Sequence, residues 1–265
     1  MIDAKPLIPA ATVLLVRDAP ALEVLMVERH YQIDFASGAL VFPGGKTGLE
    51  DHDPAWTQAI PAGFAIVGAP LALRIAAVRE AYEESGLLLA RLRGAGPGAA
   101  LVGPERMVEP MAQRAAIALG NASFLAMIQE QGFELALDTL TPFARWITPK
   151  GLPKRFDTHF YIAHAPADQD AAHDGREAVE ACWIRPSDAL AAAAEGRRKI
   201  IFPTRLNVQL LAQSQSAGEA IAAAAARRPV TVEPVIAPDA HGVLTLTIPA
   251  DAGYGAVSAP LSDVT

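Results

Sequence analysis

Three glutamates, Glu80, Glu83 and Glu84, lie close together in a segment that reads REAYEESG. At about 100° per residue, their side chains fall within about 100° of one another around a helix. Like charges at this spacing destabilise a helix by about a few tenths of a kcal/mol per pair, and a bound cation would compensate them. Clustered carboxylate oxygens suit Mg²⁺, which usually completes its shell with water and substrate phosphates. The spacing therefore predicts a divalent metal site.

The alternative is an exposed acidic helix face that water solvates. In that interpretation Arg79 and Glu83 form an ordinary i,i+4 ion pair. Ile75, Val78 and Tyr82 fall on the opposite side of the same helix, as an amphipathic surface helix requires. Both interpretations fit these residues, so the choice depends on a second part of the chain.

The second part is the FPGGK segment at residues 42–46, placed at the end of a predicted strand. Paired glycines, here Gly44 and Gly45, allow φ > 0 and let a backbone group come close to a metal or phosphate. A simple tight turn is the alternative. The following residues imitate the end of a P-loop, but Leu40 stands where that motif needs glycine and no helix follows Thr47. We therefore exclude a P-loop.

Together the two segments resemble the signature of the Nudix family. Gly45 followed after five residues by Asp51 resembles the first half, with Asp in place of the usual Glu. The second half, R-E-x-x-E-E-x-G, is present at every position from Arg79. The 27 residues from 52 to 78 separate the two halves, far more than the family normally has. If the first half starts at Gly44 instead, Glu50 becomes the acid, so that assignment stays open.

An insertion inside this signature is similar to the branch of peroxisomal coenzyme A diphosphatase-like Nudix proteins. The segments 143–149 and 155–158 also resemble that branch, so the resemblance spans most of the chain. Arg29 and Gly38, ahead of the FPGG run, resemble part of a coenzyme A diphosphatase motif, although Asp34 stands where that motif has a basic residue.

The resemblance implies an α/β/α Nudix sandwich with a central mixed sheet and extra helices. It also implies a Mg²⁺- or Mn²⁺-dependent enzyme that hydrolyses the pyrophosphate bond of a nucleoside diphosphate linked to another moiety. Coenzyme A or acyl-CoA, ADP-ribose, NADH and nucleotide sugars stay open as substrates. The alternative is a non-catalytic nucleotide-binding regulator on the same fold. The complete REAYEESG pattern favours catalysis, because a binding module gains nothing from crowding three like charges.

The resemblance also implies a set of site residues. The metal ligands expected are Glu80, Glu83, Glu84, Gly44 and, before the strand that ends at Trp183, Glu180. A general base must deprotonate the attacking water. The residues expected to act in catalysis are Glu83, Arg79 and Asp51, with Arg79 orienting a carboxylate. The residues expected to bind substrate are Arg29, Gly45, Arg155 and Trp56, the last by stacking on a base.

Alternating strand and helix signals surround these residues and predict a mixed sheet flanked by helices. The helix that carries the glutamates covers residues 71–89 and closes at Gly86, a residue favoured just past a helix end. We expect one domain over 1–265, with an insertion at about 52–72 and a helical insertion at about 91–132. Strands are predicted at 11–17, 22–28, 35–43, 143–147, 155–164, 178–184 and 243–248, and further helices at 110–120, 123–131, 186–194, 203–213 and 219–228.

The composition limits the kinds of partner that the protein is expected to bind. The chain has 29 acidic and 22 basic residues, a net charge of -7 and no basic stripe, so a nucleic acid partner is not expected. No apolar run approaches the roughly 18 residues of a membrane helix, and the first residues lack a secretory pattern. With Cys182 as its single cysteine, the protein is expected in the cytoplasm. A small-molecule nucleotide is the expected partner, and a homodimer is compatible with this fold.

Overall fold

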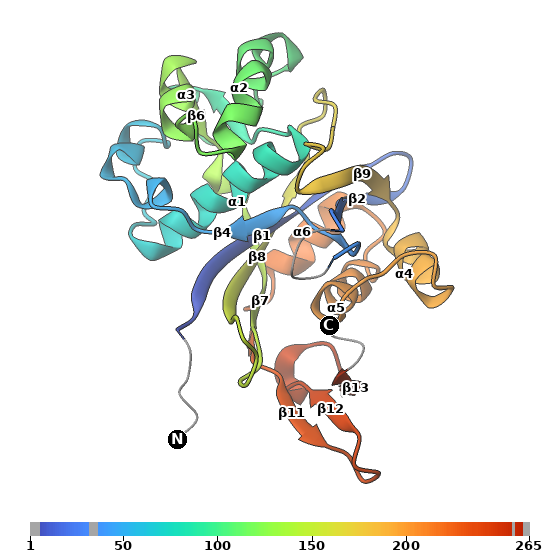
Figure 1. The fold of residues 1–265 in the computed structure, drawn as a ribbon. Helices are drawn as coiled ribbons and strands as arrows, with labels where there is room; N and C mark the ends of the chain where they lie inside the picture. Colours follow the sequence, from blue (N-terminus) through green and yellow to red (C-terminus); the bar gives the residue numbers. More distant parts are fainter. Residues whose placement is uncertain (1–5, 32–36, 256–257, 262–265) are drawn as a thin grey trace.

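The computed structural model describes residues 6–31, 37–255 and 258–261 of the chain. Asp34 and the first two residues of the strand predicted at 35–43 lie outside the described residues. Figure 1 shows a central sheet with helices on either side and a small separate sheet near the C-terminus.

Among the described residues, eight strands form the central sheet in the order β10-β7-β8-β1-β2-β3, with β4 beside β1 and β9 beside β2. The sheet is mixed, because β1 pairs parallel with β8 and antiparallel with β2 and β4. The strands are β1 (Ile8–Asp18), β2 (Leu22–Arg29), β3 (Leu40–Val41), β4 (Gly44–Lys46), β7 (Thr141–Ile147), β8 (Phe156–His164), β9 (Ala178–Ile184) and β10 (Thr231–Val232).

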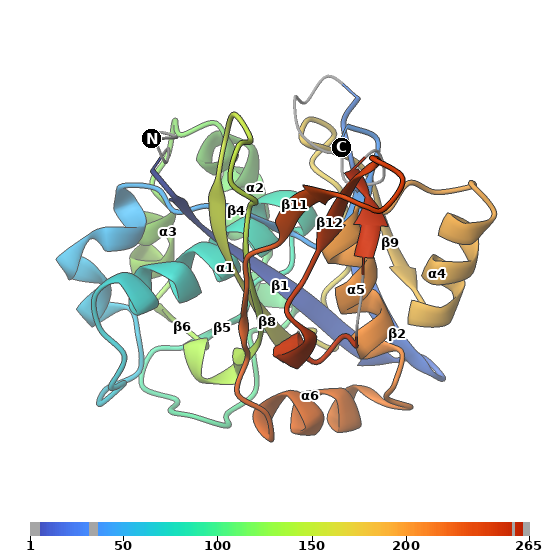
Figure 2. The ribbon, with the colours of Figure 1, turned by 90° about the horizontal axis from the view of Figure 1, so that it is seen from below.

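Side chains that alternate along β1 face two separate hydrophobic cores. Val13 and Leu15 pack in one core and Leu14 and Val16 in the other, since successive strand residues point to opposite faces. The first core contains α1 (Ala69–Ser85), α2 (Val108–Ala118) and α3 (Phe124–Glu130), and the second contains α4 (Pro186–Ala194), α5 (Phe202–Leu211) and α6 (Ala217–Ala225). Figure 2 shows these two layers on opposite sides of β1, so the predicted α/β/α sandwich is confirmed.

The strands predicted at 11–17 and 22–28 and the predicted helices are present, with ends shifted by a few residues. Within the described residues 37–43, the strand predicted at 35–43 is reduced to the two residues of β3. Six short strands of the described residues were not predicted, because runs of two to four residues carry too little periodicity to show an alternation. These are β4, β5 (Ala90–Leu92), β6 (Phe133–Leu135), β10, β11 (Val235–Pro238) and β13 (Ser258–Pro260).

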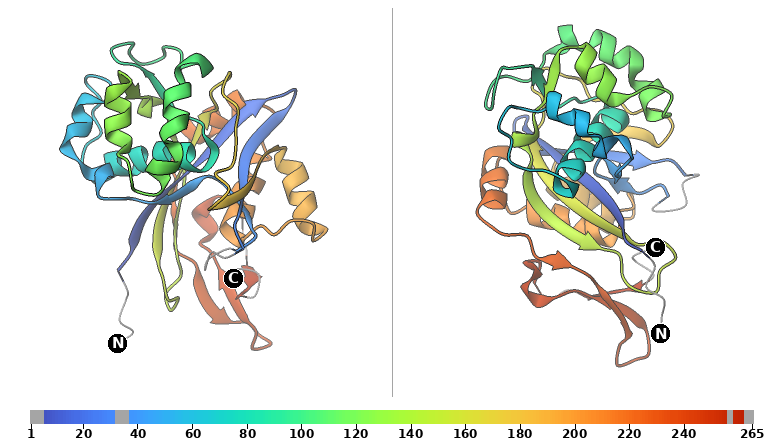
Figure 3. Two further views of the ribbon diagram at one scale, coloured as in Figure 1. Left: turned by 45° about the horizontal axis from the view of Figure 1, so that its top comes forward. Right: turned by 90° about the vertical axis from the view of Figure 1, so that its left-hand side faces the viewer.

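Both segments predicted as insertions lie on the α1 side of the sheet, where Figure 3 shows them gathered over that helix. The first begins with two short 3-10 helices, Glu50–His52 and Pro54–Gln58. The second carries α2 and α3 between the paired strands β5 and β6. They cover a helix whose side chains are buried on nearly every side.

Helix α1 ends as the sequence predicts. Gly86 adopts a left-handed φ of 76°, and its N–H donates to the Tyr82 carbonyl at 2.9 Å.

The strand predicted at 243–248 is β12 (Leu244–Thr247), which pairs with β11 (Val235–Pro238) and β13 (Ser258–Pro260) in a small second sheet. Within the described ranges, none of the helices combines the length and apolar content that crossing a bilayer needs.

Candidate active site

The glutamates of α1 are buried rather than solvated. Glu80 is 9% exposed and Glu84 is 4% exposed, while the side chain of Glu83 keeps 15% of its surface. Burying carboxylates costs free energy unless cations and hydrogen bonds compensate them. The alternative of an exposed acidic helix face is therefore wrong.

Arg79 connects most of these carboxylates. Its Nη1 donates to Glu80 Oε1 at 2.9 Å and lies 3.1 Å from Glu83 Oε2. Its Nε and Nη2 donate to the two carboxylate oxygens of Asp51 at 3.0 and 2.9 Å. Nη2 also donates to the Lys46 carbonyl at 3.1 Å. One guanidinium thus fixes the end of β4 and three carboxylates, using the planar fork that a lysine lacks.

The structure places Asp51 and Glu50 in different environments. Asp51 is 2% exposed and accepts the Gly48 N–H at 2.7 Å in addition to Arg79. Glu50 accepts the Phe124 N–H at 3.0 Å and the Ser123 hydroxyl, at the start of α3. Asp51 therefore faces the site, whereas Glu50 stabilises the N-terminus of a neighbouring helix.

Gly44 and Gly45 bring β4 against the glutamates. The Gly44 N–H donates to Glu84 Oε2 at 3.0 Å. A Cβ at Gly45 would lie 2.5 Å from the Glu80 carboxyl group. Neither glycine has a positive φ, so the expected use of φ > 0 is wrong. Gly45 needs to be glycine because β4 approaches Glu80 closely there, and Gly44 because its Cβ would meet Ala11 and Thr12 of β1.

The burial and crowding of the carboxylates change their acidity. Burial, opposed in part by Arg79, raises the pKa of Glu80 to about 7. Burial and the neighbouring Glu80 raise the pKa of Glu84 well above its ordinary value. Burial also raises the pKa of Glu83, against the effect of Arg79. This group of acids carries more negative charge than Arg79 alone can neutralise.

The donor set fits a hard divalent cation. In the described part of the chain, no three acidic, His or Cys side chains form a ready-made metal cluster. Glu80 and Glu83 point toward Arg79, and Glu84 accepts the Gly44 N–H. Three adjacent carboxylates whose pKa values are raised by burial and by one another are nevertheless the oxygen ligands that Mg²⁺ and Mn²⁺ prefer. A bound cation would remove the repulsion that the structure contains.

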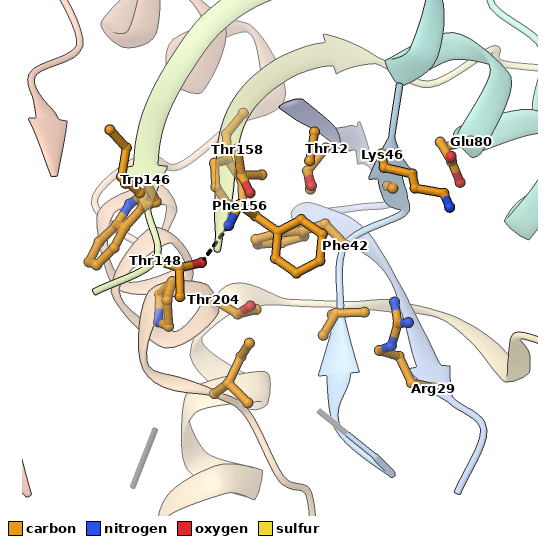
Figure 4. A pocket seen from close by; sticks show the side chains of 18 of the residues that line it. Thr12, Arg29, Phe42, Lys46, Glu80, Trp146, Thr148, Phe156, Thr158 and Thr204 are labelled. Carbon is orange, nitrogen blue, oxygen red and sulfur yellow. Dashed lines mark hydrogen bonds between the residues drawn. The ribbon is translucent and has the colours of Figure 1, made fainter. Parts of the chain in front are cut away.

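A cleft of about 540 Å³ opens beside these carboxylates. In Figure 4, Glu80, Lys46 and Arg29 lie on one side, and Trp146 lies on the other. A second hollow shares Gly48, Arg79 and Glu83 with the cleft. Glu83 therefore faces open space on two sides.

The predicted ligand Glu180 is held elsewhere. Its carboxylate accepts a hydrogen bond from Arg198 Nη2 at 2.8 Å, and this arginine lowers the pKa of Glu180. Glu180 is absent from the described lining of the cleft, whereas Glu177 lines it and adds to the raised pKa values of Glu80, Glu83 and Glu84. Both acids stand near the start of one predicted strand, so the sequence alone does not show which of them faces the cleft. In the structure, Glu177 lies in the bend before β9 and lines the cleft.

Two of the residues predicted to bind substrate are not in the described lining of the cleft. Trp56 is 1% exposed, packs against Phe124 and donates its Nε1–H to the Glu50 carbonyl at 2.8 Å, so it anchors the insertion. Arg155 is 6% exposed and donates to Glu233 Oε1 at 2.6 Å. Arg29 does line the cleft, and its Nε is buried without a hydrogen-bond partner among the described residues.

Comparisons with known proteins point to one family. A family model described as NUDT19 Nudix domain matches residues 62–205. The acyl-coenzyme A diphosphatase NUDT19 of Gallus gallus is 29% identical over 234 residues, covering 68% of this chain and 61% of that protein. The Homo sapiens protein of the same name is 28% identical over 208 residues, covering 64% of this chain and 55% of that protein. The chain thus spans little more than half the length of these curated relatives.

A solved structure agrees with the fold and covers most of both chains. The NUDIX hydrolase from Alicyclobacillus acidocaldarius has a TM-score of 0.66 and 26% sequence identity to this chain. The likeness covers 82% of this chain and 96% of that one.

Proposed function

This chain belongs to the NUDT19 Nudix domain family, and we propose that it hydrolyses the diphosphate bond of a nucleoside diphosphate derivative, with coenzyme A and its acyl thioesters as first candidates. The observation that carries the proposal is the group Glu80, Glu83 and Glu84 at one end of an open cleft, with the first two held by Arg79 and the third by the Gly44 N–H. The names of the curated relatives, acyl-coenzyme A diphosphatases, favour these thioesters over ADP-ribose, NADH and nucleotide sugars.

Glu80, Glu83 and Glu84, beside the backbone of Gly44, would hold Mg²⁺ or Mn²⁺. When bound, such an ion supplies positive charge that stabilises the diphosphate and the departing phosphate. Arg29 and Lys46, which line the cleft on the same side as Glu80, bind the remaining phosphate oxygens. Because Gly45 carries no side chain, it leaves room for the phosphate oxygens to approach this end of the cleft.

Arg79 is a positioning residue in this proposal. Its hydrogen bonds fix the carboxylates of Glu80 and Glu83, and Asp51 in turn fixes the guanidinium. Asp51 is itself held by the Gly48 N–H at 2.7 Å. Groups held this way need little rearrangement during the reaction, which lowers its barrier.

Glu83 is the first candidate for the general base. It lines both the cleft and the neighbouring hollow, so water can reach it. Burial raises its pKa, which strengthens it as a base. One Glu83 oxygen takes a proton from water, the water oxygen bonds to phosphorus, and the bridging P–O bond breaks. The departing phosphate takes the bonding electrons, and each product keeps one of the two phosphates of the diphosphate.

The test is a substrate panel given to the purified chain with Mg²⁺ and with Mn²⁺. Coenzyme A, an acyl-CoA, ADP-ribose, NADH and a nucleotide sugar are compared, with products identified by mass. We expect coenzyme A species to give two phosphate-bearing fragments, and no turnover in EDTA. Binding of a panel member without turnover under any metal would favour the regulator and contradict the proposal.

A further inference from the structure

The far end of the cleft is closed by a part of the chain that lies outside the 62–205 match. Figures 1 and 2 show the sheet of β11, β12 and β13 beside β7 and α5. Pro234, just before β11, and Leu246, in β12, line the cleft. Leu246 is 1% exposed and packs in the same core as Trp146 and Phe202. The C-terminal sheet thus provides an apolar wall opposite the acidic end.

Partly buried polar contacts hold this wall in place. Arg155 Nη2 donates to Glu233 Oε1 at 2.6 Å, next to Pro234. Trp146 Nε1 donates to the Tyr254 hydroxyl at 3.2 Å, and that hydroxyl donates to Asn207. These contacts hold the residues that flank β11 and β12 to β7, to α5 and to the residue before β8, so the wall has a defined position.

The charges along the cleft indicate which part of a substrate fits at this end. Among the described lining residues, the basic ones are Arg29, Lys46 and Arg79, of which Arg79 contacts Glu80 and the other two lie on the same side of the cleft as Glu80 (Figure 4). A phosphorylated nucleoside carries negative charge that needs such cations. The end formed by Trp146 and Leu246 offers none, and therefore suits an uncharged, apolar part of the substrate.

We propose that the C-terminal sheet forms the end wall of a subsite for an acyl chain carried by the substrate, and that Leu246 and Pro234 are specificity-determining residues. The proposal rests on the proposed function, because the diphosphate must lie near Glu80 for the acyl arm to extend toward Leu246. Each methylene that leaves water for such a wall strengthens binding about fourfold. The protein should therefore prefer acylated over free coenzyme A.

The test compares dissociation constants of coenzyme A and decanoyl-CoA, measured by calorimetry in EDTA so that no turnover occurs. Leu246→Ala is expected to lower the wild-type preference for decanoyl-CoA by about tenfold, since it removes three carbons from the wall. Leu246→Val should lower it less. Leu244→Ala is the matched control, because Leu244 lies in the same strand, is 50% exposed and is not a lining residue.

An unchanged preference in folded Leu246→Ala or Leu246→Val protein would overturn the proposal, as would equal affinities in the wild type. Thermal melting checks folding, and Leu246→Val decides the matter if the alanine variant does not fold. Turnover with Mg²⁺ is measured separately. A chain that prefers decanoyl-CoA through Leu246 but hydrolyses neither compound would refute the proposed function and keep the subsite.

Discussion

Arg79 and Asp51 form two parallel hydrogen bonds, of 3.0 and 2.9 Å, across 28 positions of the chain. The pair joins α1 to the 3-10 helix at the start of the insertion. The side chain of Asp51 is fully buried and that of Arg79 is 12% exposed. The long insertion therefore leaves the two halves of the signature in contact.

Arg79→Lys keeps the positive charge but cannot make two parallel hydrogen bonds to Asp51. We expect kcat to fall about 100-fold, because Glu80 and Glu83 lose the group that orients them. Steady-state kinetics on the best substrate of the panel measures this. Arg228→Lys, at an exposed position, is the control. A wild-type kcat in the Arg79→Lys variant would refute the positioning role.

The two adjacent glycines should respond differently to alanine. The Cβ of Gly45→Ala would lie 2.5 Å from the Glu80 carboxyl, which can move, so activity falls while the fold survives. The Cβ of Gly44→Ala would lie 2.6 Å from the Ala11 carbonyl of β1, so the melting temperature falls as well. Gly218→Ala, in α6 with open space around it, should be neutral or stabilising. Equal melting temperatures for the Gly44 and Gly45 variants would contradict this distinction.

Metal-free protein should become less stable as pH rises. Burial raises the pKa of Glu80 to about 7, and unfolding returns it to the ordinary 4.5. Between these values the unfolded chain has released a proton that the folded chain keeps, so the free energy of unfolding falls with rising pH and then levels off. The raised pKa values of Glu83 and Glu84 act in the same direction.

Urea unfolding in EDTA from about pH 5 to pH 8 measures how steeply the free energy of unfolding falls with pH. Mg²⁺ at the upper pH should restore stability, because it binds the ionised carboxylates of the folded state. Glu80→Gln should flatten the slope. Stability in EDTA that increases across this range would show that the buried acids do not titrate as described.

Trp56 should matter for stability and not for substrate choice. Trp56→Ala is expected to cost about 3–5 kcal/mol of unfolding free energy, as for other large buried side chains. Leu49→Ala, at a side chain that is 96% exposed, is the nearby control. Denaturant unfolding gives the cost, and the relative kcat/KM values across the substrate panel should not change. A selective loss of activity toward one nucleotide substrate would instead support a role for this ring in stacking on the base.

The sequence predicts those features that depend on local periodicity. The helix with Glu80, Glu83 and Glu84 and its end at Gly86 follow from spacing within a few turns. Asp51 could not be separated from Glu50, because both lie in one 3-10 turn and only its orientation sends Asp51 toward Arg79.

The sequence does not show which side chains are buried or which residues distant in the chain they contact. Arg155 looks like a free cation in the sequence, but its partner Glu233 lies 78 positions away. The wall residue Leu246 packs in one core with Trp146 and Phe202, which lie far from it in the sequence. Such contacts depend on tertiary structure, so the spacing of nearby residues in the sequence does not predict them.

The most direct test of the account is the turnover of Glu83→Gln beside that of Glu109→Gln, an exposed control on α2. Both proteins are given coenzyme A and decanoyl-CoA with Mg²⁺, with folding and affinity in EDTA checked. We predict that kcat of Glu83→Gln falls by about a thousandfold or more, while its affinity stays near wild type and Glu109→Gln is unaffected. Turnover at the wild-type rate in folded Glu83→Gln protein would contradict the assignment of Glu83 as the general base.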